Sequence, residues 1–186
     1  AADPNRRTDW IKARETTLAI RCMTATGHPF AKAERQRIQY AMTVVTPSAP
    51  SSDEKHNLEI SVIAPVYGCQ GCLEDLADQV QAAIEAMDVS FEMVLVDDSS
   101  PDGAWARIME LASTRPWLRG LRLSRNFGQH SAISAGIEHS RGRWTVVMDC
   151  DLQDVPAEIP ALYRKAQEDQ LDVVFAQRSE EHTSEL

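Results

Sequence analysis

The chain has 186 residues, 43% of them apolar, and a formal net charge of −9 at pH 7. This length is that of one domain, and the apolar content is enough for one packed core. The negative charge argues against a nucleic-acid-binding protein, which needs a basic surface to release counterions from phosphates. The sequence contains neither a run of about 18 apolar residues, as a transmembrane helix requires, nor the apolar segment of a secretory signal.

Charge divides the chain near residue 42. Residues 1–41 hold eight Lys and Arg against four Asp and Glu (+4), which leaves eleven against twenty-four (−13) for residues 42–186. Residues 1–41 show no strand signal, and Met42 opens a Pro-, Ser- and Thr-rich stretch typical of a flexible leader. We therefore expect residues 1–57 to be a flexible or non-native leader, with Met42 as an alternative start.

Short apolar runs alternate with helical periodicity from residue 58 onward. The pattern predicts strands at 59–66, 91–97, 120–124, 143–149 and 171–176, and helices at 72–87, 104–114, 128–140 and 157–169. Strands alternating with crossover helices favour an α/β fold with a parallel, Rossmann-like sheet covered on both faces. Ligands of such sheets bind at the carboxyl ends of the strands.

Two of the four cysteines, Cys69 and Cys72, are three positions apart. This spacing occurs in zinc and redox sites, but a zinc site needs a second pair or histidines at ligand spacing, and none is present. We favour small residues packed at a strand-to-helix turn, with metal or redox use as the alternative.

Polar residues follow the first two predicted strands. Pro65 and Tyr67 come at the end of the first, where the tyrosine ring can lie against a base. Asp98 follows the second, where a carboxylate can accept a hydrogen bond from a base or a ribose hydroxyl. Helix capping is the alternative for this segment, and we assign it to Asp102.

The third predicted strand leads into Arg125 and Asn126, followed by Gly128 at the start of a helix. The free backbone N–H groups of a helix start favour an anion, so Arg125 is a candidate for holding phosphate or base. His130, one turn into this segment, is interpreted as a surface or packed histidine.

The fourth strand ends in "VVMDCDLQD", residues 146–154. Side chains two apart in an extended segment point the same way, so Asp149, Asp151 and Gln153 can converge. Three oxygen donors suit Mg²⁺ or Mn²⁺, which completes its coordination with water and substrate phosphates. The alternative for this D-x-D motif is a solvated acidic loop, but the neighbouring polar strand ends favour a metal site.

Four segments, "SVIAPVYG", "VLVDDSSPDG", "RNFGQHSAISAG" and "MDCDLQDVP", resemble in order and spacing those of family 2 glycosyltransferases with the GT-A fold. The resemblance is greatest to the branch of dolichyl-phosphate mannose synthases and bacterial polyprenyl-phosphate glycosyltransferases. It covers about residues 59–178.

The resemblance implies that Pro65, Tyr67 and Asp98 line the nucleotide pocket and that Cys150 lies near the ribose. It also implies that the metal bridging the diphosphate is held by three residues, Asp149, Asp151 and Gln153. The role of Arg125 in nucleotide-sugar binding stays open. The family often has Asn-Glu after the tyrosine, where this chain has Gly68-Cys69.

The implied activity is metal-dependent, inverting transfer of a sugar from a UDP- or GDP-sugar to a polyprenyl phosphate or another membrane or cell-envelope glycan acceptor. The family's acceptor part, its catalytic base and any membrane helices lie downstream of residue 178. We therefore expect a truncated, inactive N-terminal fragment whose full-length form acts in the cytoplasm at the inner face of the membrane. Residues 179–186 match a translated sequencing adapter and are predicted to be an artefactual tail.

Two other functions share parts of this pattern. A phosphoacceptor receiver domain needs an aspartate at the end of the third strand, where this chain has Leu123-Ser124-Arg125. A sugar nucleotidyltransferase shares the fold and the metal, but it needs a Gly-rich basic loop after the first strand, and "YGCQGCLED" is acidic.

Overall fold

The computed structural model describes residues 19–22, 42–45 and 58–176. Strands and helices alternate from residue 58, as the sequence predicts. The strands are β3 (Leu58–Val66), β4 (Phe91–Asp97), β5 (Leu118–Leu123), β6 (Gly142–Val147) and β7 (Val173–Phe175). The helices are α1 (Leu73–Glu85), α2 (Ala104–Thr114), α3 (Gln129–His139) and α4 (Ile159–Glu168), with 3₁₀ turns η2 (Gln70–Cys72) and η3 (Pro156–Glu158). None of the described helices is long and apolar enough to cross a membrane.

One sheet of seven strands forms the centre, in the order β2-β5-β4-β3-β6-β1-β7. The neighbours β5, β4, β3 and β6 pair in parallel, which confirms a mostly parallel α/β sheet. The fifth predicted strand, β7, forms over Val173–Phe175 but pairs with the antiparallel strand β1 (Ala19–Cys22) rather than directly with β6.

Strand β1 corrects the sequence analysis, which found no strand signal in residues 1–41. Strand β2 (Met42–Val45), inside the predicted leader, likewise pairs with β5 as an antiparallel edge. Four residues are too few to show a period, so these strands depend on partners distant in sequence. The remainder of the predicted leader and the predicted tail from residue 179 lie outside the described residues. Whether residues 1–41 are native stays a prediction.

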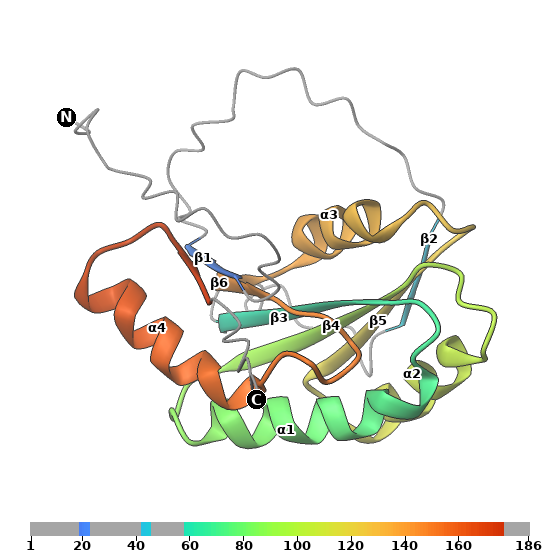
Figure 1. The fold of residues 1–186 in the computed structure, drawn as a ribbon. Coiled ribbons are helices and arrows are strands. Elements are labelled where there is room, and N and C mark those ends of the chain that lie inside the picture. Colours follow the sequence, from blue (N-terminus) through green and yellow to red (C-terminus); the bar gives the residue numbers. More distant parts are fainter. Residues whose placement is uncertain (1–18, 23–41, 46–57, 177–186) are drawn as a thin grey trace, which may run out of the picture.

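Helices cover both faces of the sheet. Helices α1, α2 and α4 lie on one face and α3 lies on the other (Figure 1). Side chains of β3 alternate between the two faces. Val62 and Ala64 pack with α1, α2 and α4, whereas Ile63 packs against α3. All three are fully buried.

Helix α3 packs closely against β3. A Cβ added to Gly136 of α3 would lie 2.4 Å from the Ile63 side chain, so glycine lets the helix approach β3 closely.

The chain builds β3, β4 and β5 outward in one direction and then returns past β3 to form β6. This reversal between β3 and β6 opens a crevice at their carboxyl ends.

The opposite, amino end of the sheet holds a buried ion network. Glu92 is fully buried in β4 and accepts hydrogen bonds from Ser61, Arg119 and Arg141. Desolvation acts to raise the pKa of Glu92, but the two guanidinium groups and the serine outweigh it and lower the pKa from its ordinary value of 4.5.

We expect Glu92→Ala to lower the free energy of unfolding at neutral pH by about 3–5 kcal/mol, because buried arginine charge would lose its partner. Urea denaturation measures this change. Glu110→Ala, which removes an exposed carboxylate paired with Arg107, should have a much smaller effect. Equal effects of the two substitutions would contradict a structural role for the network.

The same network predicts a pH dependence. Because the pKa of Glu92 is lower in the folded than in the unfolded state, its contribution is fully present above about pH 4.5 and is lost as the pH falls through the lowered value. Urea denaturation from pH 6 to pH 3 should show stability falling more steeply in the wild type than in Glu92→Ala.

Candidate nucleotide-sugar site

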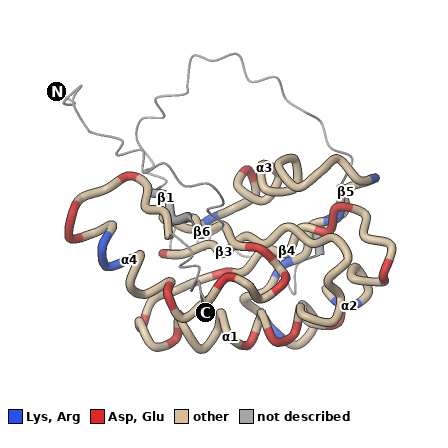
Figure 2. Tube along the Cα trace, in the orientation of Figure 1, with Lys and Arg blue, Asp and Glu red and all other residues tan. Residues whose placement is uncertain are grey.

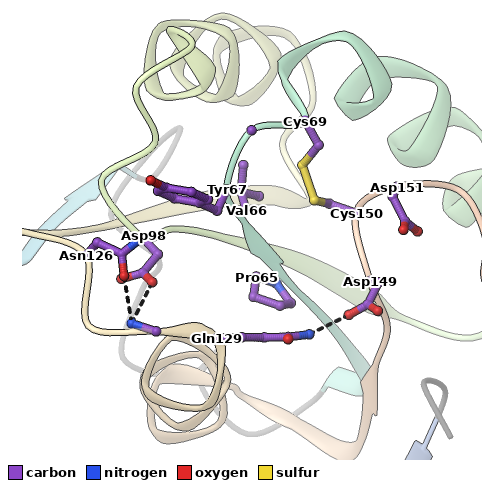
Figure 3. Close-up of a pocket in the computed structure, with 12 residues that line it drawn as sticks. Pro65, Val66, Tyr67, Cys69, Asp98, Asn126, Gln129, Asp149, Cys150 and Asp151 are labelled. Carbon is purple, nitrogen blue, oxygen red and sulfur yellow. Dashed lines mark hydrogen bonds between the residues drawn. A yellow bond between two sulfur atoms is a disulfide. The ribbon is translucent and has the colours of Figure 1, made fainter. Parts of the chain in front are cut away.

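A cavity of about 370 Å³ opens at the carboxyl ends of the parallel strands (Figure 3). Its walls come from the segments that follow β3, β4, β5 and β6. Several lining residues were predicted from the sequence, namely Pro65, Tyr67, Asp98, Asp149, Cys150 and Asp151, and others were not, among them Cys69, Asn126 and Gln129. The structure therefore brings together most of the predicted site residues.

The segment after β6 folds back on itself. The Met148 N–H donates to Ile63 O at 3.1 Å, so ladder pairing continues to the residue before Asp149. The Asp149 N–H then donates to the Asp154 carboxylate at 2.8 Å, and the Gln153 N–H donates to Asp151 Oδ1 at 3.0 Å. These bonds close a tight loop that turns the Asp149 and Asp151 carboxylates into the cavity wall.

Asp98 lies at the end of β4 with 2% of its surface exposed. Its two carboxylate oxygens accept the backbone N–H groups of Phe127 and Gly128, each at 2.8 Å. The Gly128 N–H, which the sequence analysis left free for a substrate anion, is thus bound by the protein's own carboxylate. The negative charge of Asp98 also interacts favourably with the positive, amino-terminal end of the α3 helix dipole.

The loops after β3 and β4 are joined by Asp102. Its carboxylate accepts the Ala104 N–H at 3.1 Å and the Gln70 N–H at 2.8 Å. The N-cap residue of α2 is Gly103, which makes no side-chain cap bond, so the assignment of the cap to Asp102 is wrong by one position. Desolvation acts to raise the pKa of Asp102, but hydrogen bonds from Ser100, Gln70 and Ala104 lower it below its ordinary value. Ser100 Oγ also accepts the Gly68 N–H at 2.8 Å, which fixes the backbone directly after Tyr67.

Neighbouring Asp97 has a different environment. Its carboxylate is fully buried and accepts the Ser100 N–H at 2.9 Å. Burial raises the pKa of Asp97, and the Ser100 hydrogen bond and the Arg122 guanidinium offset this only in part. Asp97 therefore belongs to the strand end and does not line the cavity.

Three predicted site residues differ in their placement. Tyr67 lines the cavity with 56% of its surface exposed, so its ring is accessible at the mouth. Arg125 is exposed and lies over the Phe127 ring, 4.3 Å from its centroid, and it is not among the lining residues. Gln153 is exposed and is also not a lining residue, so the structure does not bring this predicted third ligand to the cavity wall.

Cys150 forms a disulfide with Cys69, 81 residues earlier in the chain. The sequence spacing groups Cys69 with Cys72 and does not predict this pair, and Cys72 is the free cysteine within residues 58–176. The disulfide joins the loop after β3 to the residue between Asp149 and Asp151 (Figure 3). Cys150 therefore lines the cavity as half of a covalent connection between two of its walls.

The cavity is strongly acidic. The described lining residues include three aspartates, Asp98, Asp149 and Asp151, and neither lysine nor arginine. Acidic residues also lie along α1 (Figure 2). There Asp78 accepts a hydrogen bond from Arg115. A diphosphate placed beside the cavity carboxylates would be repelled by them unless a cation lay between the two.

The donor set fits a hard divalent cation. Asp149 and Asp151 supply oxygen ligands from one loop, and Mg²⁺ is commonly held by one or two carboxylates with substrate phosphates completing its shell. Within residues 58–176 and the two short strands, no group of three or more His, Cys, Asp or Glu is arranged to hold a metal by itself. A cation here would therefore share its ligands between protein and substrate.

The sequence profile of "Glycosyl transferase family 2" matches residues 61–184. The chain belongs to this family. The match includes every cavity-lining residue described above. The match to this family argues against both alternatives, the receiver domain and the sugar nucleotidyltransferase.

Relatives within the family carry a specific name. The chain is 44% identical over 119 residues to an undecaprenyl-phosphate 4-deoxy-4-formamido-L-arabinose transferase of Shewanella sediminis, covering 61% of this chain and 36% of that protein. It is 42% identical over 135 residues to the protein of the same name from Edwardsiella ictaluri, covering 72% and 41%. The chain thus spans well under half the length of these relatives.

Among solved structures, S. aureus TarS 1–349 in complex with UDP-GlcNAc is similar with a TM-score of 0.51 and 20% identity. The match covers 61% of this chain and 32% of that one. At this identity the likeness supports the GT-A-like fold alone.

We expect reduction of the Cys69–Cys150 disulfide to lower the free energy of unfolding by about 4 kcal/mol, because the bond closes a loop across 81 residues and restricts the unfolded chain. Urea denaturation with and without dithiothreitol measures the difference. Cys72→Ser should keep the full response to the reductant, whereas Cys69→Ser combined with Cys150→Ser should show none. A non-reduced peptide map without a Cys69–Cys150 cross-link would contradict the pairing.

Proposed function

We propose that this chain forms the nucleotide-sugar-binding part of an inverting glycosyltransferase that moves a sugar from a UDP- or GDP-sugar to a polyprenyl phosphate. The observation that carries the proposal is the acidic cavity at the strand ends, where Asp149 and Asp151 face a space large enough for part of a nucleotide sugar. The undecaprenyl-phosphate transferases among the relatives support the acceptor class. Another membrane or cell-envelope glycan is the alternative acceptor.

Different residues of the cavity are assigned to different parts of the donor. Tyr67 offers an exposed aromatic face and Pro65 an apolar surface for the nucleoside, with Asp98 beside them at the end of β4. Cys150, in its disulfide, forms the wall between this region and the carboxylates, near the expected position of the ribose. Arg125, outside the cavity lining, is available only to parts of the donor that extend beyond it.

Asp149 and Asp151 are the proposed ligands of Mg²⁺ or Mn²⁺. Bound there, the cation would offset the negative charge of the diphosphate leaving group. Gln153, whose backbone N–H orients Asp151, contributes to this site through the loop conformation. The donor diphosphate would supply the ligand oxygens that the described protein residues do not.

The reaction is a single in-line displacement. An oxygen of the acceptor phosphate forms a bond to the anomeric carbon while the bond from that carbon to the diphosphate breaks, and the electron pair leaves with the nucleoside diphosphate. A lipid phosphate is already ionised at neutral pH, so it needs no strong base, whereas a hydroxyl acceptor would need one. We assign no catalytic base among the described residues.

The acceptor sets the proposed location, at the cytoplasmic face of the membrane that contains the lipid. Because the chain spans 36% of the length of one relative and 41% of another, we expect the 186-residue chain alone to bind donor nucleotide and to turn over little. Membrane association would then depend on segments beyond residue 178.

Isothermal titration of UDP and GDP into the chain, with and without Mn²⁺, tests the proposal. We expect Mn²⁺ to strengthen binding in the wild type and the double variant Asp149→Ala/Asp151→Ala to lose more than about tenfold of the affinity measured with Mn²⁺. In metal-free buffer the wild type should bind weakly and the double variant no more weakly, because two carboxylates that repel the diphosphate are gone.

The matched control replaces two exposed carboxylates at the far ends of α1 and α4, Glu85→Ala/Glu168→Ala, which alters net charge equally. It should bind as the wild type does. Wild-type binding that is indifferent to Mn²⁺ and survives loss of both aspartates would refute the proposed site.

A further inference from the structure

Gln129, the first residue of α3, makes one well-defined contact across the cavity. Its Nε2 donates a hydrogen bond to Asp149 Oδ1 at 2.7 Å (Figure 3). The two residues are 20 positions apart and come from the segments after β5 and β6. Gln129 itself is exposed, so its contribution to packing is small.

The backbone before Gln129 is held in place from β4. Asp98 binds the N–H groups of Phe127 and Gly128, and Asn126 Oδ1 accepts the Gly128 N–H at 3.0 Å. Gly128 has φ +92°, a conformation that other residues rarely adopt, so glycine is required for this entry into α3. The side chain of Gln129 therefore extends from a fixed backbone position.

Asp149 is restrained on its backbone as well as on its side chain. Its N–H is bound by the Asp154 carboxylate, and its Oδ1 accepts the Gln129 amide. A neutral amide donor orients a carboxylate without cancelling its charge, whereas a lysine or arginine at this place would compete with a cation. The hydrogen bond therefore holds the Asp149 carboxylate at the cavity wall.

We propose that Gln129 is a positioning residue for the cation site: its amide holds the Asp149 carboxylate in the orientation in which it binds the divalent ion. This inference rests on the proposed function, because it assigns to Gln129 a role in the metal binding proposed for Asp149. Residues that orient a metal ligand through a hydrogen bond commonly change metal affinity 10–100-fold when replaced.

The test compares Gln129→Met with Gln81→Met. Methionine keeps the length and unbranched shape of glutamine but cannot donate the hydrogen bond. Gln81 is a matched control, because its Nε2 also donates to a carboxylate, Glu85, at 2.7 Å, on α1 away from the cavity. Electron paramagnetic resonance of free Mn²⁺, with saturating UDP and a protein-free titration that corrects for Mn²⁺ bound by UDP in solution, gives the Mn²⁺ affinity and needs no turnover.

We expect Gln129→Met to weaken Mn²⁺ binding about 10–100-fold, with UDP affinity in metal-free buffer within about twofold of wild type and an unchanged melting temperature. Gln81→Met should bind Mn²⁺ as the wild type does. Gln129→Asn, whose shorter side chain keeps the amide but does not reach Asp149, should reproduce the loss and serves if the methionine variant does not fold.

The outcomes separate the two proposals. Wild-type Mn²⁺ affinity in Gln129→Met or Gln129→Asn overturns the positioning role and leaves the cation site intact. An equal loss in Gln81→Met would show a general effect of the substitution and would also overturn it. If the wild-type chain itself shows no Mn²⁺-dependent UDP binding, the proposed function fails, and the role of Gln129 fails with it.

Discussion

The concentration of negative charge in one cavity is the constraint on which the site depends. Asp98, Asp149 and Asp151 line the same space, and no described lining residue carries a positive charge. Each carboxylate is instead bound by uncharged N–H groups, from the 127–128 backbone, from the Gln129 amide and from the Gln153 backbone respectively. Such donors fix the orientation of the carboxylates, and the proposed divalent cation would offset the negative charge gathered at this wall.

Carboxylates at the two ends of the sheet have different environments. At the amino end, Glu92 is fully buried and paired with Arg119 and Arg141, so its charge is neutralised inside the protein and contributes to stability. At the carboxyl end, Asp149 is only partly buried and Asp151 is exposed, and they border an open cavity. Glu92 therefore stabilises the fold, whereas Asp149 and Asp151 lie at the wall of the cavity.

The topology brings the acidic residues together. Parallel pairing of β5, β4, β3 and β6 places the carboxyl ends of all four strands at one edge. Because the strand order reverses between β3 and β6, no crossover helix covers the crevice at their carboxyl ends. Helix α3 packs on the face of the sheet opposite α1, α2 and α4, and its first residue lies beside this crevice (Figure 1). The Cys69–Cys150 disulfide then fixes the loop after β3 to the loop after β6. The cavity is thus bounded by elements that are each restrained by hydrogen bonds or by a covalent bond.

Family membership gives the site its interpretation. The match to glycosyl transferase family 2 extends over residues 61–184 and includes the whole cavity lining. The named relatives act on undecaprenyl phosphate according to their names, and the chain spans 36% and 41% of their lengths. The described residues account for donor and cation binding in the proposal, and the acceptor side is left to the remainder of such a protein.

Local patterns in the sequence were sufficient to predict the strands and helices from residue 58 onward and the positions of Tyr67, Asp98, Asp149 and Asp151 at strand ends. Each depends on periodicity or on neighbours within a few residues, which the sequence displays directly. Only the tertiary structure paired Cys69 with Cys150, inserted β1 between β6 and β7, directed Gln129 to Asp149 and left Arg125 outside the cavity. These contacts join residues 20 or more positions apart or depend on where a side chain points, and neither is encoded in a local period.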